Sequence, residues 1–244
     1  MSVSYFATFV ESENYFLYKR PDFRQWGSPL TGEYPKYKSQ TDKNPISTDI
    51  CVSAWEQDWF HAYRRVNSGP EVDFWAISDP QNYPKLVEWL SHPSIKGFNQ
   101  DSLYVSLGPN GSFFARCNLG YRWHGIPDGA ETILQSFLGG NKWRVKPNQF
   151  LFGQSDCYII IDDLGKVYYD EKKRDFYYPL LFDELDRIAG QEGTVEFLSF
   201  RPSNSPACDY FLVYNINDTR CVLPYAESWK VQERLIALKR KISG

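Results

Sequence analysis

The chain has 244 residues with a formal net charge of −3, and 17% of its residues are aromatic. Its 42% hydrophobic and 23% charged residues exclude an intrinsically disordered chain, and its 16 glycines and 15 prolines exclude collagen-like and low-complexity architectures. The lack of a basic excess argues against nucleic acid as a partner, because nucleic-acid-binding surfaces are normally rich in Lys and Arg.

The first two groups of predicted elements are short strands in which apolar and aromatic residues alternate with polar ones. The first group has strands over 5–9, 14–18 and 23–26, followed by a polar loop over 31–48. The second has strands within 50–63, a third strand over 72–77 and a helix over 83–90. Each group therefore predicts a small antiparallel sheet.

The clearest group begins at Leu103, where Asn110-Gly111 lies between two alternating apolar runs. This dipeptide is the strongest short-range signal for a β-hairpin, because both residues accept a positive φ. A third strand over 121–126 and a helix over 128–138 follow.

The last two groups repeat this order of strands and helix. The fourth has a hairpin over 158–170 turning at Gly165, a third strand over 175–178 and a helix after Pro179. The fifth has strands over 195–200, 210–214 and 219–223 and a helix over 226–242.

Together these groups predict a mainly β protein with helices (α+β), built as one domain over 1–244. We expect about five tandem three-stranded antiparallel meander-plus-helix repeats, with approximate bounds 5–30, 50–92, 103–139, 156–190 and 195–242. Closure into a propeller-like ring is favoured because it removes exposed strand edges. An open stack and a large twisted sheet with helices on one side are the alternatives.

One segment also resembles known sequences. Ser-Leu-Gly-Pro-Asn-Gly-Ser-Phe-Phe-Ala-Arg, from Ser106 to Arg116, is followed by Trp123 and Pro127. It is similar to a repeat seen in uncharacterised fungal proteins. Those proteins have no known activity, so the resemblance implies a repeated module and no particular function.

An aromatic residue recurs in or near the third strand of four units: Trp26, Trp75, Trp123 and Tyr177. One interpretation is that these residues form a core in which each ring packs against the next unit. Alternatively, they form equivalent shallow pockets whose rings stack on a sugar or a planar ligand. Polar neighbours such as His124 would orient that ligand, although alternation along a strand turns His124 to the face opposite Trp123.

Two further tryptophans, Trp55 and Trp59, flank the tip of the predicted hairpin in the second unit. Hairpin tips face solvent, so this pair indicates a contact surface for a ligand or a protein. The alternative is that the strands extend further and both rings pack on the 31–48 loop.

The sequence predicts no metal site and no cofactor. The three histidines lack metal-ligand spacing, and no glycine-rich phosphate-binding motif occurs. The five cysteines are odd in number and scattered, and no signal peptide or membrane-spanning segment is apparent. We therefore expect reduced thiols and a cytoplasmic location.

These observations predict a non-catalytic, lectin-like binding protein whose partner is a glycan, a small molecule or another protein. The alternative is a cofactor-free enzyme of the isomerase or cyclase type with an aromatic-lined pocket. His61, His124 and Asp73 are the first candidates for its chemistry, and no catalytic residue is assigned.

Overall fold

The structure is a computed structural model. It describes residues 5–9, 15–19, 23–26, 47–55, 58–65, 72–95, 98–99, 102–140, 142–174, 178–201, 209–226, 232–233, 235–237 and 239–240. Up to residue 50 the description covers the strands without their side chains.

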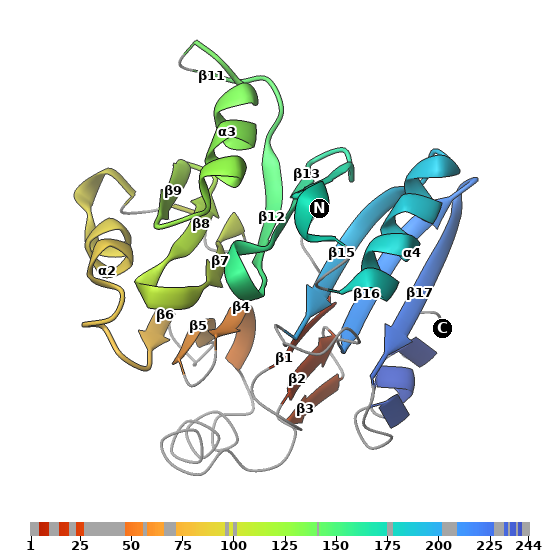
Figure 1. Ribbon diagram of the computed structural model, residues 1–244. Coiled ribbons are helices and arrows are strands. Elements are labelled where there is room, and N and C mark those ends of the chain that lie inside the picture. Colours follow the sequence, from red (N-terminus) through yellow and green to blue (C-terminus); the bar gives the residue numbers. More distant parts are fainter. Residues whose placement is uncertain are drawn as a thin grey trace. The chain divides into compact units, whose positions relative to one another are not determined.

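The described strands form six small sheets, and five of these have three strands in chain order (Figure 1). The three-stranded sheets are β1 (Tyr5–Phe9), β2 (Tyr15–Lys19) and β3 (Phe23–Trp26); β4 (Ser47–Trp55), β5 (Asp58–Arg65) and β6 (Val72–Ile77); β7 (Tyr104–Leu107), β8 (Phe113–Cys117) and β9 (Gly120–His124); β12 (Pro147–Phe152), β13 (Tyr158–Asp162) and β14 (Val167–Tyr169); and β15 (Thr194–Phe200), β16 (Tyr210–Ile216) and β17 (Thr219–Tyr225). A two-stranded hairpin consists of β10 (Leu138–Gly139) and β11 (Lys142–Trp143).

Helices follow three of the sheets. They are α2 (Pro84–Ser91) after β6, α3 (Asp128–Ser136) after β9 and α4 (Pro179–Gly190) after β14. Among the described residues, the 3-10 turns are η1 (Pro93–Ile95), η3 (Pro109–Gly111), η4 (Gln154–Asp156) and η5 (Glu171–Lys173). Near the C-terminus, every described residue of 232–240 is helical.

By its contacts the chain divides into two compact units. The first, the β4–β9 unit, contains β4 to β9 and α2; the second, the β10–β17 unit, contains β10 to β17, α3 and α4 together with β1, β2 and most of β3. Within the second unit, α4 packs on β15 and β16, and its buried face joins a core of apolar side chains from β13, β15 and β16.

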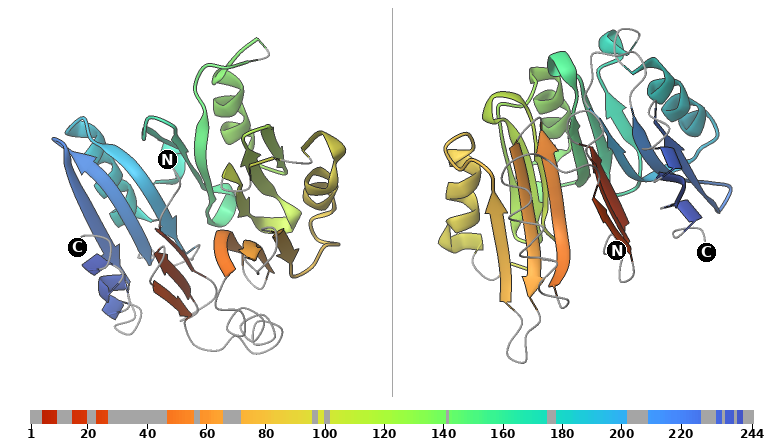
Figure 2. Two further views of the ribbon diagram at one scale, coloured as in Figure 1. Left: turned by 180° about the vertical axis from the view of Figure 1, so that it is seen from behind. Right: turned by 90° about the horizontal axis from the view of Figure 1, so that it is seen from below.

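The prediction of a mainly β chain with a few helices is confirmed, and so are the helices expected after Pro127 and Pro179. None of the described sheets closes on itself, and Figure 2 shows the orange strands β4, β5 and β6 side by side as an open meander. The propeller-like ring is therefore not seen in the strand pairing.

The fourth sheet differs from its prediction by one strand. Its first strand is β12, which lies before the predicted unit, and the hairpin expected at 158–170 forms its second and third strands. Gln149 places a polar side chain at a buried position of β12, where its Oε1 accepts a hydrogen bond from Leu198 N–H (3.1 Å). This polar residue hides the alternation by which strands are recognised.

The third strand expected over 175–178 is not in this sheet. Residues 175–177 lie outside the described residues, and Tyr178 is the residue before α4, with φ +60°. Its positive φ turns the chain into the helix, and Pro179 takes the first helical position, where no N–H is needed.

Two of the hairpin loops have the same backbone form. Each closes with a hydrogen bond from a glycine N–H to the carbonyl four residues on, namely Gly108 to Ser112 (2.9 Å) and Gly153 to Cys157 (2.7 Å). Each also holds a non-glycine residue at positive φ, Asn110 at 53° and Ser155 at 52°. The β7–β8 and β12–β13 loops are thus alike, although their sequences share only the glycine.

A buried tyrosine anchors each of these loops. Tyr83 O–H donates to Gly108 O (3.2 Å), and Tyr178 Oη accepts from Gln154 N–H (2.9 Å). Both tyrosines precede a proline that begins a helix, α2 and α4 respectively. The anchors tie each loop to the start of a helix and so hold its two strands in position.

Candidate functional site

One face of the β7–β8–β9 sheet is rich in aromatic side chains. The strand register pairs Tyr104 with Arg116, Arg116 with Tyr121, and Phe114 with Trp123. Directly paired residues of antiparallel strands share a face of the sheet. We call these five residues the aromatic face (Tyr104, Phe114, Arg116, Tyr121 and Trp123).

A tight turn at Gly111 positions the first two strands of this sheet. Gly111 has φ +74°, and a Cβ at this position would lie 2.2 Å from the carbonyl oxygen of Asn82. Only glycine meets both conditions, because other residues rarely adopt this φ and no side chain tolerates such an approach. Gly111 is therefore required both for the turn and for the close approach of Asn82 O to the backbone.

Phe114 forms the base of the aromatic face. It is fully buried, and the rings of Tyr104 and Tyr121 each lie 6.3 Å from its ring, centroid to centroid, at 59° and 56°. Tyr104, Tyr121 and Trp123 themselves are half-buried. Phe114 therefore packs against the Tyr104 and Tyr121 rings, and all three half-buried side chains keep part of their surface exposed to solvent.

Arg116 adds a cation to this face. Its guanidinium carbon lies 5.4 Å from the centre of the Tyr104 ring, and its Nη1 donates to Ser102 O (3.1 Å). Burial lowers the pKa of Arg116, and the neighbouring Tyr104 and Tyr121 partly offset that shift. A guanidinium keeps its charge in proteins at neutral pH, so Arg116 is a cationic hydrogen-bond donor.

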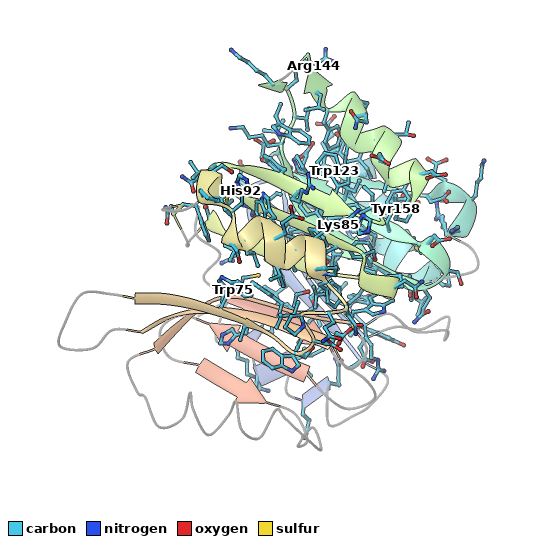
Figure 3. All side chains as sticks on the ribbon, turned by 90° about the vertical axis from the view of Figure 1, so that its left-hand side faces the viewer. Trp75, Lys85, His92, Trp123, Arg144 and Tyr158 are labelled. Carbon is cyan, nitrogen blue, oxygen red and sulfur yellow. The ribbon has the colours of Figure 1, made fainter. Side chains whose placement is uncertain are left out.

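The opposite side of β9 is polar. Arg122 and His124 are exposed. The His124 ring lies 6.5 Å from the ring of Phe113, which is on the same face as His124 and opposite the aromatic face. His124 Nδ1 is 3.4 Å from Lys85 Nζ of α2, and Figure 3 labels Lys85 on α2 and Trp123 on β9. The alternation therefore separates His124 from Trp123, and the two cannot contact one ligand on the same face.

The remaining predicted aromatic residues are dispersed. Trp75 of β6 is half-buried and stacks on Phe60, with ring centres 6.4 Å apart and planes at 23°. Trp55 ends β4 and is buried (6% exposed), whereas Trp59 of β5 is half-buried. The burial of Trp55 favours packing over an exposed contact at this tip.

Three other predicted residues cannot be placed in the site. The side chains of Trp26 and Asp73 and the whole of Tyr177 lie outside the described residues. His61 is buried in β5, whereas His124 is exposed.

Four of the five residues of the aromatic face are not among the site residues predicted from the sequence: Tyr104, Phe114, Arg116 and Tyr121. The alternation around Asn110-Gly111 places Tyr104 and Arg116 on the same face, so their pairing could have been inferred from the turn. The partial exposure of that face depends on how the rest of the chain covers the sheet, and no local pattern carries this information.

Comparison with known proteins gives no family for this chain. No protein-family model matches the sequence, and no curated protein matches it. Within the described part of the chain, no three His, Cys, Asp or Glu residues are grouped so that they could hold a metal ion. Likewise, none of the described helices is long and apolar enough to cross a membrane.

Proposed function

We propose that this protein is a non-catalytic binding protein that recognises a glycan through the aromatic face. The observation that carries the proposal is the row of half-buried rings, Tyr104, Tyr121 and Trp123, on the same side of one sheet as a guanidinium. Flat rings with one open face stack on the apolar face of a sugar ring, and an arginine beside them can donate to sugar hydroxyls.

The rigidity of this surface supports binding. The Tyr104 and Tyr121 rings pack against the fully buried Phe114, and the strands of this sheet are held by the Gly111 turn and by the hydrogen bond from Tyr83 to the loop. A ligand that binds a preorganised surface loses less free energy to the ordering of side chains. The enzyme alternative gains no support from the geometry, because His61 is buried in β5 while His124 is exposed on β9.

The prediction that the chain is built from repeats is also part of this proposal. We infer that the five three-stranded sheets are copies of one unit, which the matching loops of β7–β8 and β12–β13 support. In that case the aromatic face is a specialised surface of one copy. The central strand of the β12–β14 sheet, β13, carries Ile159, Ile160 and Ile161, whereas the central strand of the β7–β9 sheet, β8, carries Phe114 and Arg116. Closure of the copies into a propeller-like ring stays a prediction.

A tryptophan-fluorescence titration with a panel of mono- and oligosaccharides, read with a thermal-shift assay, tests the proposal. We expect a saturable change for at least one sugar that is lost in Trp123→Ala. The matched control is Trp143→Ala, which removes another half-buried tryptophan from a different sheet and should keep the change. A panel that gives no saturable change, or a change that survives in folded Trp123→Ala, contradicts glycan binding by this face.

A further inference from the structure

The charge of the aromatic face has a definite sign. Its five residues are three half-buried rings, the buried Phe114 and Arg116, so its charged side chain is a cation. None of the five offers a carboxylate or an amide oxygen. The whole chain has 30 acidic and 27 basic residues, so the positive charge of this face does not follow from the composition.

Strand pairing places Arg116 at the centre of the face. Arg116 lies directly opposite Tyr104 on one neighbouring strand and Tyr121 on the other. Trp123 is two residues beyond Tyr121, which makes it the diagonal neighbour of Arg116, with Cα atoms about 7–8 Å apart. Long side chains interact over such a diagonal. A group at the edge of a sugar ring that stacks on Trp123 is therefore within reach of the guanidinium.

Uncharged groups help to position this guanidinium. Its Nη1 donates to Ser102 O (3.1 Å), and its central carbon lies 5.4 Å from the centre of the Tyr104 ring. Ser102 is itself fixed, because its hydroxyl donates to Asn99 O and accepts from Asn118 N–H (2.8 Å). These contacts orient the guanidinium and leave its positive charge in place.

Partial burial strengthens the attraction of Arg116 for an anion. Burial lowers the pKa of Arg116 because the charged guanidinium loses part of its hydration. A charge in such a place is screened less by salt than a charge on an exposed surface. The guanidinium is also planar, and its N–H groups form a fork that matches the two oxygens of a carboxylate. A carboxylate therefore complements Arg116 in both charge and shape.

We propose that the aromatic face recognises acidic sugars, with the carboxylate of a uronic acid bound by Arg116 and the sugar ring stacked on Trp123. This inference rests on the proposed glycan function and names the class of sugar. A neutral sugar fits less well, because its hydroxyl groups donate as well as accept, and the acceptor oxygens among the five residues are two phenols. A uronic acid replaces one of those hydroxyl groups by a carboxylate, which only accepts.

Matched oligosaccharides test the charge preference directly. The probes are an oligogalacturonate and an oligoglucuronate, each compared with its methyl ester, which keeps the sugar chain and removes the charge. A sulfated cello-oligosaccharide of the same length supplies a different anion. Dissociation constants are measured on the full chain by tryptophan fluorescence and isothermal titration calorimetry. We expect at least one uronate to bind about tenfold or more tightly than its methyl ester.

Arginine variants locate this preference on one face of the sheet. Arg116→Gln should bring the ratio of the two dissociation constants close to one. The matched control Arg122→Gln makes the same change in net charge at an exposed position on the opposite face of β9, and it should keep the ratio. Arg116→Lys keeps the charge without the planar fork and should give an intermediate ratio. Thermal unfolding verifies that each variant is folded. If Arg116→Gln is not, Arg116→Lys and the matched probes still decide.

The outcomes separate this inference from the proposed function. Equal affinity for each uronate and its methyl ester, with binding lost in Trp123→Ala, would overturn the choice of acidic sugars and leave glycan binding intact. Tighter binding of the sulfated probe than of either uronate would overturn it too. So would an equal fall of the ratio in Arg116→Gln and Arg122→Gln, because the preference would then come from net charge. No saturable binding of any neutral or acidic probe would contradict both proposals.

Discussion

Replacing Asp162 with Ala should strongly destabilise the β10–β17 unit. The Asp162 side chain is buried (2% exposed), and it accepts three hydrogen bonds. Its Oδ1 accepts from the N–H groups of Leu164 and Lys166, both at 2.9 Å, and its Oδ2 accepts from Tyr168 O–H at 3.0 Å. The carboxylate thus satisfies two backbone donors of the β13–β14 turn and joins the turn to β14.

The magnitude follows from the number of hydrogen bonds. Each is worth about 1–1.5 kcal/mol net, and the loss of all three leaves partly buried donors without an acceptor, so Asp162→Ala should lower the free energy of unfolding by roughly 3–4 kcal/mol. Asp162→Asn keeps an acceptor oxygen for the turn, and its amide group can donate to the Tyr168 hydroxyl. This variant should cost only about 1 kcal/mol.

Urea unfolding followed by circular dichroism measures both variants. We expect a lower midpoint with an unchanged slope, because the surface exposed on unfolding stays the same. A cost below about 1 kcal/mol for Asp162→Ala, or equal costs for the Ala and Asn variants, would refute the assigned role of the three hydrogen bonds.

Two other predictions concern a glycine and the tyrosines. Gly111→Ala should lower the free energy of unfolding by at least about 2 kcal/mol, because the added Cβ would lie 2.2 Å from Asn82 O in a backbone with φ +74°. In the control variant Gly120→Ala the added Cβ has no atom within 4 Å, so thermal stability should change little. Burial raises the pKa of three tyrosines from 10 to about 12: Tyr158, Tyr168 and Tyr169. Their contribution to stability is fully present below pH 10 and is lost as the pH rises to 12, because the unfolded chain releases these protons first. Phenolate absorbance during an alkaline titration should therefore show a late-titrating group of tyrosines, and normal titration of every tyrosine in the folded protein would contradict this.

Local chemistry determines which elements of this fold can be predicted from the sequence. Asn110-Gly111, Pro127 and Pro179 specify turns and helix starts through the backbone angles and hydrogen bonds of a few neighbouring residues. Each of these signals depends only on residues that are close to it in the sequence. The hairpin at 110–111 and the helices after both prolines are therefore readable without knowledge of the rest of the fold.

The burial of individual side chains depends on residues that are distant in the sequence, so only the tertiary structure determines it. Gln149 can take a buried strand position because its side chain accepts a hydrogen bond from Leu198 N–H of β15. A polar residue at a buried position breaks the apolar alternation of β12, so the sequence pattern does not predict this strand. The same reason applies to the candidate site. Strand alternation puts Trp123 and His124 on opposite faces, but packing by the rest of the chain decides how much of each side chain stays exposed. Asn82 and Gly111 are far apart in the sequence, and only the folded chain brings Asn82 O against the glycine.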